Sequence, residues 1–80
     1  MSDSTQPLWA PVNTAGDLGR FLRELRLRRG LTQAQLAEEL GVTRQYVTEI
    51  EQGKSNLYTD RLFHSLRLLG GRLRVDAVER

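Results

Sequence analysis

The stretch Thr-Gln-Ala-Gln-Leu-Ala-Glu-Glu-Leu-Gly-Val-Thr-Arg-Gln-Tyr-Val-Thr-Glu-Ile-Glu-Gln, residues 32–52, decides how this 80-residue chain folds. It predicts two short helices broken at Gly41, because each half opens on a threonine whose hydroxyl can cap a helix start. Thr32 is followed three residues later by Gln35, which is the spacing of a capping box. Apolar residues recur at helical spacing in both halves. They are Leu36, Ala37, Leu40, Val47 and Ile50.

Only a few residues around Gly41 join these helices, so the two must meet at a steep angle, as in a helix-turn-helix. The second helix keeps an outward polar face, whose members are Arg44, Gln45, Thr48, Glu49 and, at its edge, Tyr46. Arginine and glutamine match the edges of guanine and adenine in the major groove, and both stand at the helix N-terminus, where base contacts are made. We expect this face to contact DNA bases. The alternative is a solvated surface of an all-α bundle.

Glu49 does not fit this face easily. A carboxylate that faces DNA repels phosphate unless it accepts a hydrogen bond from a cytosine amino group. It can equally serve to suppress non-specific binding, and the sequence leaves both roles open.

The chain resembles the Xre/Cro/phage-repressor family from about Leu18 to Leu69. The matching residues are Gln33, Ala37, Gly41, Val42, Val47, Ile50, Glu51 and Gly53-Lys54. The resemblance implies an all-α, lambda-repressor-like four-helix domain that binds DNA. It also implies an ion pair between Arg26 and Glu51 that ties the first helix to the third, and a phosphate contact from Gln33, which also buttresses Gln45.

The remaining helices of the domain, residues 15–70, flank this unit. The first is expected from Thr14, with Asp17 as its capping-box partner, to Gly30. The last is expected over residues 59–69, with an apolar face of Leu62, Phe63, Leu66 and Leu69. The loop before it should lie along the sugar-phosphate backbone. The candidates for phosphate contacts are Gln33, Thr43, Gln52, Lys54, Ser55 and Asn56.

Both ends of the chain lie outside this domain. Residues 1–14 are expected to form a flexible tail, except that Leu8–Val12 contains a tryptophan that is costly to leave in water. This segment either packs on the domain, adds as an edge strand beside the C-terminal segment, or docks a partner protein.

Residues 71–80 contain an alternating segment, Arg72–Val78, which predicts a strand with Leu73, Val75 and Ala77 on one face. A single strand needs another edge. We expect the same strand of a second copy, which makes a homodimer; the alternative is a frayed tail.

Composition narrows the function. Leu18–Arg29 has five arginines against one glutamate and Arg61–Arg74 has four against no acid, so basic segments flank the helix-turn-helix and suit phosphate anchoring. The chain has no cysteine and one histidine, so no metal site or other cofactor is expected. No apolar run is long enough to span a bilayer and no export signal is evident, which suggests a cytoplasmic, nucleoid-associated protein. No set of catalytic groups can be assembled, so we do not expect an enzyme.

A four-helix Xre-like domain followed directly by one strand resembles the HipB-type antitoxins. That resemblance implies a dimer that binds an inverted-repeat operator in double-stranded DNA, represses its own toxin–antitoxin operon and holds a HipA-like kinase toxin inactive. A solo Xre-family or phage-type repressor with no toxin partner uses the same residues and remains the alternative. A module that binds only protein is the other open class.

Overall fold

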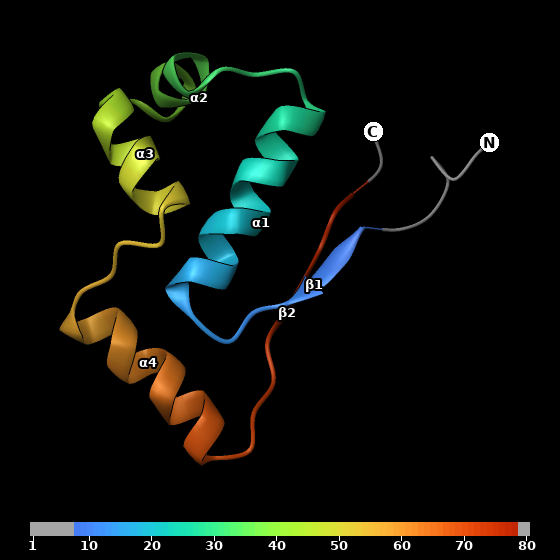
Figure 1. Cartoon of the computed structure of the whole chain (residues 1–80), viewed down its shortest axis with the longest axis vertical. Helices are drawn as coiled ribbons and strands as arrows, with labels where there is room; N and C mark the ends of the chain where they lie inside the picture. The colour runs from blue at the N-terminus through green and yellow to red at the C-terminus, as the bar shows by residue number, and fades with distance from the viewer. Residues whose placement is uncertain (1–7, 79–80) are drawn as a thin grey trace.

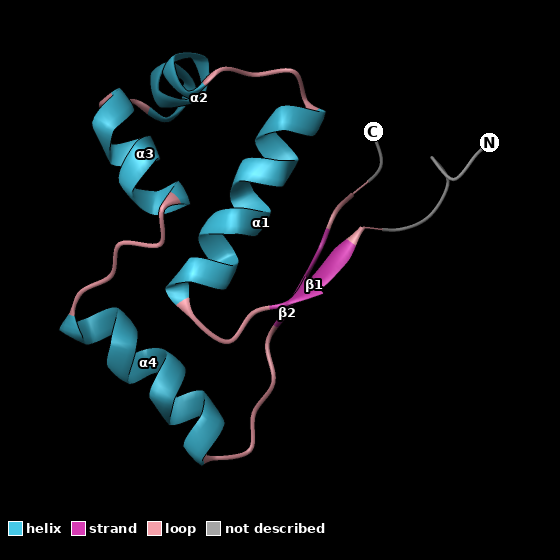
Figure 2. Ribbon diagram, viewed as in Figure 1, coloured by secondary structure: helices cyan, strands magenta, loops and turns pink. Residues whose placement is uncertain are grey.

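The computed structural model describes residues 8–78 and contains four helices and a two-stranded sheet. Figures 1 and 2 show how they follow one another. The elements are β1 (Trp9–Pro11), α1 (Ala15–Arg28), α2 (Gln33–Leu40), α3 (Arg44–Glu51), α4 (Leu57–Leu68) and β2 (Arg74–Asp76). The predicted four-helix domain with its helix-turn-helix is therefore confirmed. Its buried apolar residues are Val12, Phe21, Ala37, Val47 and Phe63.

Helix α1 begins as the sequence predicts but with a different cap. The Thr14 hydroxyl accepts a hydrogen bond from the backbone N–H of Asp17. The Asp17 carboxylate accepts one from the N–H of Asn13, at 2.9 Å, so it does not close a capping box on Thr14. This bond is the main reason that the pKa of Asp17 lies below its usual range. Two donors at the helix start are still satisfied, by a slightly different pair of contacts.

The α2–α3 unit follows its local signals closely. The capping box at Thr32 is complete, with bonds of 3.0 Å and 2.9 Å in its two directions between Thr32 and Gln35. Gly41 ends α2 with a left-handed φ of 74°, a conformation that costs glycine little. Thr43 then caps α3 by accepting from the N–H of Tyr46. These three points of local chemistry set the sharp turn between the helices.

Helix α4 starts two residues earlier than predicted, at Leu57, because Asn56 caps it by accepting from the N–H of Thr59 at 2.9 Å. Two of its predicted core residues are wrong: Leu62 is 51% exposed and Leu69 is 84% exposed. At 3.6 residues per turn, Leu69 lies about 120° around the helix from buried Phe63. The apolar arc is therefore too wide for the narrow face that α4 turns toward the domain.

The two strands pair antiparallel, with Trp9 opposite Asp76, Ala10 opposite Val75 and Pro11 opposite Arg74. The Leu8–Val12 segment thus adds as an edge strand beside the C-terminal segment, which was one of its three alternatives, and Val12 is only 1% exposed. Residues 1–7 of the expected tail and residues 79–80 lie outside the described residues.

Strand β2 is shorter than the predicted segment, and the strand that it pairs with in the structure is β1 of the same chain, not the same strand of a second copy. Of the expected dimer-strand residues, Val75 and Ala77 are half-buried, whereas Leu73 is 40% exposed. Pairing across a dimer stays a prediction.

Candidate nucleic-acid interface

Helix α3 is held close to α1 by a glycine. A Cβ atom on Gly19 would collide with the backbone carbonyl oxygens of Ile50 and Glu51, so only glycine lets the end of α3 approach α1 this closely. Val47, at 2% exposure, fills the inner side of α3. A second close approach joins Gly53 to the backbone of Gly16 and places the loop after α3 at the start of α1. Gly53 was noted only as a match to the family, and Gly16 and Gly19 were not singled out, because nothing in the local sequence distinguishes a glycine that faces another backbone.

Arg26 and Glu51 meet beneath α3. Arg26 Nε lies 2.6 Å from Glu51 Oε2, and Nη2 lies 3.0 Å from Oε1. The third nitrogen of Arg26, Nη1, donates to the carbonyl oxygen of Leu31 at 2.7 Å. Both side chains are buried. The hydrogen bonds from Arg26 lower the pKa of Glu51 despite its burial, so the carboxylate is ionised at neutral pH.

Gln33 connects this buried pair to the outer face of α3. Its amide nitrogen donates to Glu51 Oε1 at 3.0 Å. Its carbonyl oxygen accepts from the Thr48 hydroxyl at 3.0 Å and from Arg44 Nε at 3.4 Å. The expectation that Gln33 buttresses Gln45 is therefore wrong. The geometry explains this, because position 44 is the first residue of α3 and lies on the side that faces the start of α2.

The N-terminal half of α3 is open to solvent. Arg44, Gln45 and Tyr46 are exposed, and no other part of the described chain covers them, whereas Thr48 and Glu49 are half-buried. Gln45 Nε2 donates to Glu49 Oε2 at 3.2 Å, and Lys54 Nζ lies 3.6 Å from the same oxygen. Glu49 is thus engaged by both an amide and a cation. The contact between Glu49 and Gln45 was not predicted from the sequence.

The predicted phosphate-contacting residues differ in what they have left to donate. Thr43 and Asn56 use their oxygens to cap helices, which leaves the hydroxyl proton and the amide N–H groups available. The Ser55 hydroxyl donates its proton to Asp60 at 2.7 Å, which leaves none for a phosphate. Gln52 and Lys54 are exposed. Five of the six candidates therefore keep a side-chain donor for a phosphate. In Gln33 the amide nitrogen that would donate is already bonded to Glu51.

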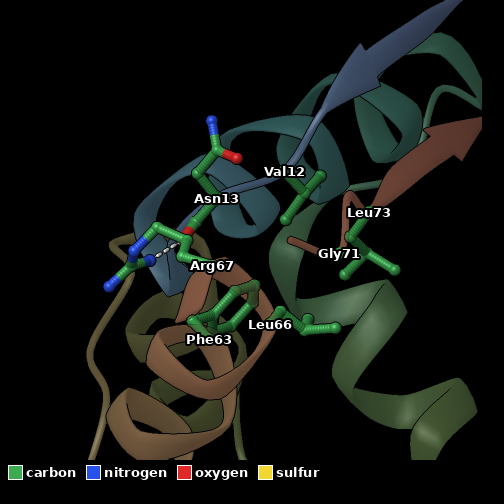
Figure 3. Close-up of a pocket in the computed structure, with 7 residues that line it drawn as sticks. All are labelled: Val12, Asn13, Phe63, Leu66, Arg67, Gly71 and Leu73. Atoms are coloured by element: carbon green, nitrogen blue, oxygen red, sulfur yellow. Dashed lines mark hydrogen bonds between the residues drawn. The ribbon is translucent and has the colours of Figure 1, made fainter. Parts of the chain in front are cut away.

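A small crevice lies on another side of the domain, where β1, α4 and the approach to β2 meet (Figure 3). It is lined mostly by apolar side chains, and Arg67 crosses its rim to donate to the carbonyl oxygen of Asn13 at 2.6 Å. The space in it that is open to the centre of a water molecule is about 10 Å³, which is room for about one water. It is therefore a packing seam between elements. Within residues 8–78 there is also no cluster of three or more metal-ligating side chains.

A family model described as a helix-turn-helix domain matches residues 17–80. This chain belongs to the helix-turn-helix domain family. The match contains the α2–turn–α3 unit, in which α3 is the recognition helix of a DNA-binding motif. Comparison with curated proteins and with solved structures gives no match. None of the helices described for this helix-turn-helix protein combines the length and the apolar character that crossing a membrane requires.

Proposed function

We propose that this helix-turn-helix protein is a dimeric, sequence-specific transcriptional repressor that binds an inverted-repeat operator through α3. The observation that carries the proposal is the exposure of Arg44 and Gln45 at the N-terminus of a helix whose inner side is fixed by a buried ion pair. Side chains that enter the major groove must be free to reach bases, and the helix that carries them must be rigid. Both conditions are met at α3.

The contacts suggest how the work is divided among the residues of α3. Arg44, held from behind by Gln33, is suited to the two acceptors of a guanine. Gln45 is suited to an adenine and is oriented by Glu49, which can also accept from a cytosine amino group. Tyr46 lies beside them, 53% exposed, within reach of a thymine methyl group or a sugar. Phosphates are left to the flanking donors, of which Lys54 carries a full charge.

An inverted repeat requires two copies, whose recognition helices must lie about one helical turn, ~34–36 Å, apart. The C-terminal strand is the proposed joint. Its own chain supplies a neighbour on one edge of β2, and the exposure of Arg74 and Asp76 supports a second neighbour on the other edge.

The proposal has a finer part, that the repressor is the antitoxin of a HipBA-like operon and neutralises a kinase-type toxin. It is supported by the layout of four helices followed directly by one strand. Its test is genetic: the adjacent gene should encode a kinase-like protein whose expression arrests growth, and co-expression of this chain should restore growth. A neighbour with no such effect leaves a solo repressor.

The main proposal is tested by footprinting the purified protein on its own promoter while its stoichiometry is measured in the same sample. We expect two protected half-sites for every two chains. A protein that remains single at working concentrations, or that protects no segment of its promoter more strongly than random duplex, would refute the dimeric repressor.

A further inference from the structure

Among residues 8–78, strand β2 is paired along one edge, with β1, and no described strand pairs with its other edge. The Val12 N–H donates to the Leu73 carbonyl at 2.9 Å, and the Ala77 N–H donates to the Leu8 carbonyl at 2.7 Å. Backbone groups in an antiparallel pair point alternately toward and away from the neighbouring strand. The register therefore directs the backbone N–H and C=O groups of Arg74 and Asp76 away from β1.

Of the two outer edges of the sheet, the edge of β2 is the one that can accept another strand. On the outer edge of β1, Pro11 has no N–H to donate, and proline confines a strand to the border of a sheet. On the outer edge of β2 no proline interrupts the chain from Arg72 to Val78. An added strand will therefore find a complete set of donors and acceptors only beside β2.

The side chains along this open edge carry opposite charges two positions apart. Arg74 Nη2 lies 3.2 Å from Asp76 Oδ1, and the Arg74 guanidinium lies over the Trp9 ring, 4.9 Å from its centre. All three side chains are exposed, and the alternation of the strand puts Arg74 and Asp76 on the same face. An antiparallel strand of the same sequence presents these charges in reverse order.

The geometry points to a second copy of this chain paired antiparallel along β2 with Val75 at the two-fold axis, so that Arg74 of each copy lies opposite Asp76 of the other. This inference rests on the proposed dimer and adds its register and the residues that set it. The outward groups of Arg74 and Asp76 then form the hydrogen-bonded pairs, and the two Val75 residues form the closer, non-hydrogen-bonded pair between them. Opposite charges directly across an antiparallel pair attract, and like charges repel.

Neighbouring registers lack this match. An axis at Arg74 places Arg74 opposite itself, although it also places Asp76 opposite Arg72 of the other copy, and an axis at Asp76 places Asp76 opposite itself. An axis between two residues sets outward backbone groups against inward ones, so the strands cannot form hydrogen bonds. Only the register centred on Val75 pairs both charges reciprocally.

The assembly that results is closed. It has the strand order β1–β2–β2–β1, and Pro11 stands on each outer edge, where it discourages further strands. Two-fold pairing thus ends at two copies. It also joins two sheets that would each be marginal as a two-stranded unit.

Charge exchange tests the register. Four full-length proteins are compared by sedimentation equilibrium: wild type, Arg74→Asp, Asp76→Arg and the double variant Arg74→Asp/Asp76→Arg. In each single variant like charges face each other twice, so we expect the dimer dissociation constant to rise at least about tenfold. In the double variant opposite charges face each other again, and the constant should return to within about threefold of wild type.

Mixing the two single variants removes any ambiguity over folding. In their heterodimer two aspartates face two arginines, so native mass spectrometry of an equimolar mixture should show mainly the mixed dimer. A chain damaged by its substitution would stay damaged in the mixture. Single variants that dimerise like wild type, a mixture that forms no mixed dimer, or a monomeric wild type would each overturn the register.

The same samples separate this inference from the proposed function. Equal dimerisation by all four proteins, with operator binding intact, overturns the register and leaves the repressor standing. Charge-dependent dimers that bind no duplex support the register and overturn the repressor.

Discussion

Removing Glu51 should be the most damaging single truncation beneath the recognition helix. Glu51→Ala leaves the Arg26 guanidinium buried, with Nε and Nη2 stripped of their acceptors and only Nη1 still bonded, to the Leu31 carbonyl. Breaking a buried ion pair in this way costs about 3–5 kcal/mol. A domain of this length has a total stability of about 4–12 kcal/mol. The variant should therefore lose a large share of its free energy of unfolding and melt about 12–40 °C lower.

The assay is urea unfolding followed by circular dichroism, applied to a double-mutant cycle. Arg26→Met should cost a similar amount, because it leaves the Glu51 carboxylate buried with one remaining donor, Gln33. The double variant Arg26→Met/Glu51→Ala should be more stable than the sum of the two losses predicts, since neither charge is then stranded.

The matched control is Glu24→Ala. Glu24 pairs with Arg28 at 3.6 Å, but both side chains are about half exposed, and such surface pairs contribute 1 kcal/mol at most, roughly. A loss from Glu51→Ala no larger than that of this control, or two single losses that simply add, would show that the buried pair does not hold α3 on α1.

Four further predictions follow from the contacts. Arg44→Ala should weaken operator binding by about 1–3 kcal/mol and relax specificity at one base in each half-site, and equal losses on operator and random duplex in a competition assay would contradict its role. Lys54→Ala should weaken binding to every sequence and reduce the slope of log K against log salt by about one, so an unchanged slope rules the contact out. Gly19→Ala should destabilise the domain by about 1–3 kcal/mol through its collision with α3, whereas Gly16→Ala, which meets only ordinary contacts, should not; equal melting temperatures would disprove the close approach. Because the pKa of Glu51 is lowered in the folded state, its contribution to stability should be complete above about pH 4.5 and be lost as the pH falls through the lowered value; Glu51→Gln should flatten that part of the stability profile, and a profile that stays as steep would assign the acid sensitivity to other groups.

The helix-turn-helix was predictable because its signals are local. Thr32, Gln35, Gly41 and Thr43 each act on backbone groups within a few residues, so their spacing alone sets both helix starts and the turn between them. The exposure of Arg44 follows from the same periodicity.

Features that depend on contacts between residues far apart in the chain were harder to predict from the sequence. The strand partner of β2 lies more than sixty residues away in the chain, and the Ala10–Val75 pairing leaves no trace in either segment taken alone. The prediction of which α4 residues are buried was partly wrong for a related reason. A run of leucines does not show how much of a helix its neighbours can cover. The role of Gln33 was half right. Its position was recognised, but its partners depend on how α2 and α3 cross.

The side-chain amide of Gln33 contacts two groups of residues on α3. Its nitrogen bonds Glu51 of the buried ion pair, and its oxygen bonds Arg44 and Thr48, two of the residues proposed to contact bases. A substitution at Arg44 still leaves the Gln33 oxygen its bond from Thr48, so we expect changes at position 44 to alter the proposed operator preference with little loss of thermal stability. A substitution of Gln33 itself should change both the preferred DNA sequence and the stability of the fold.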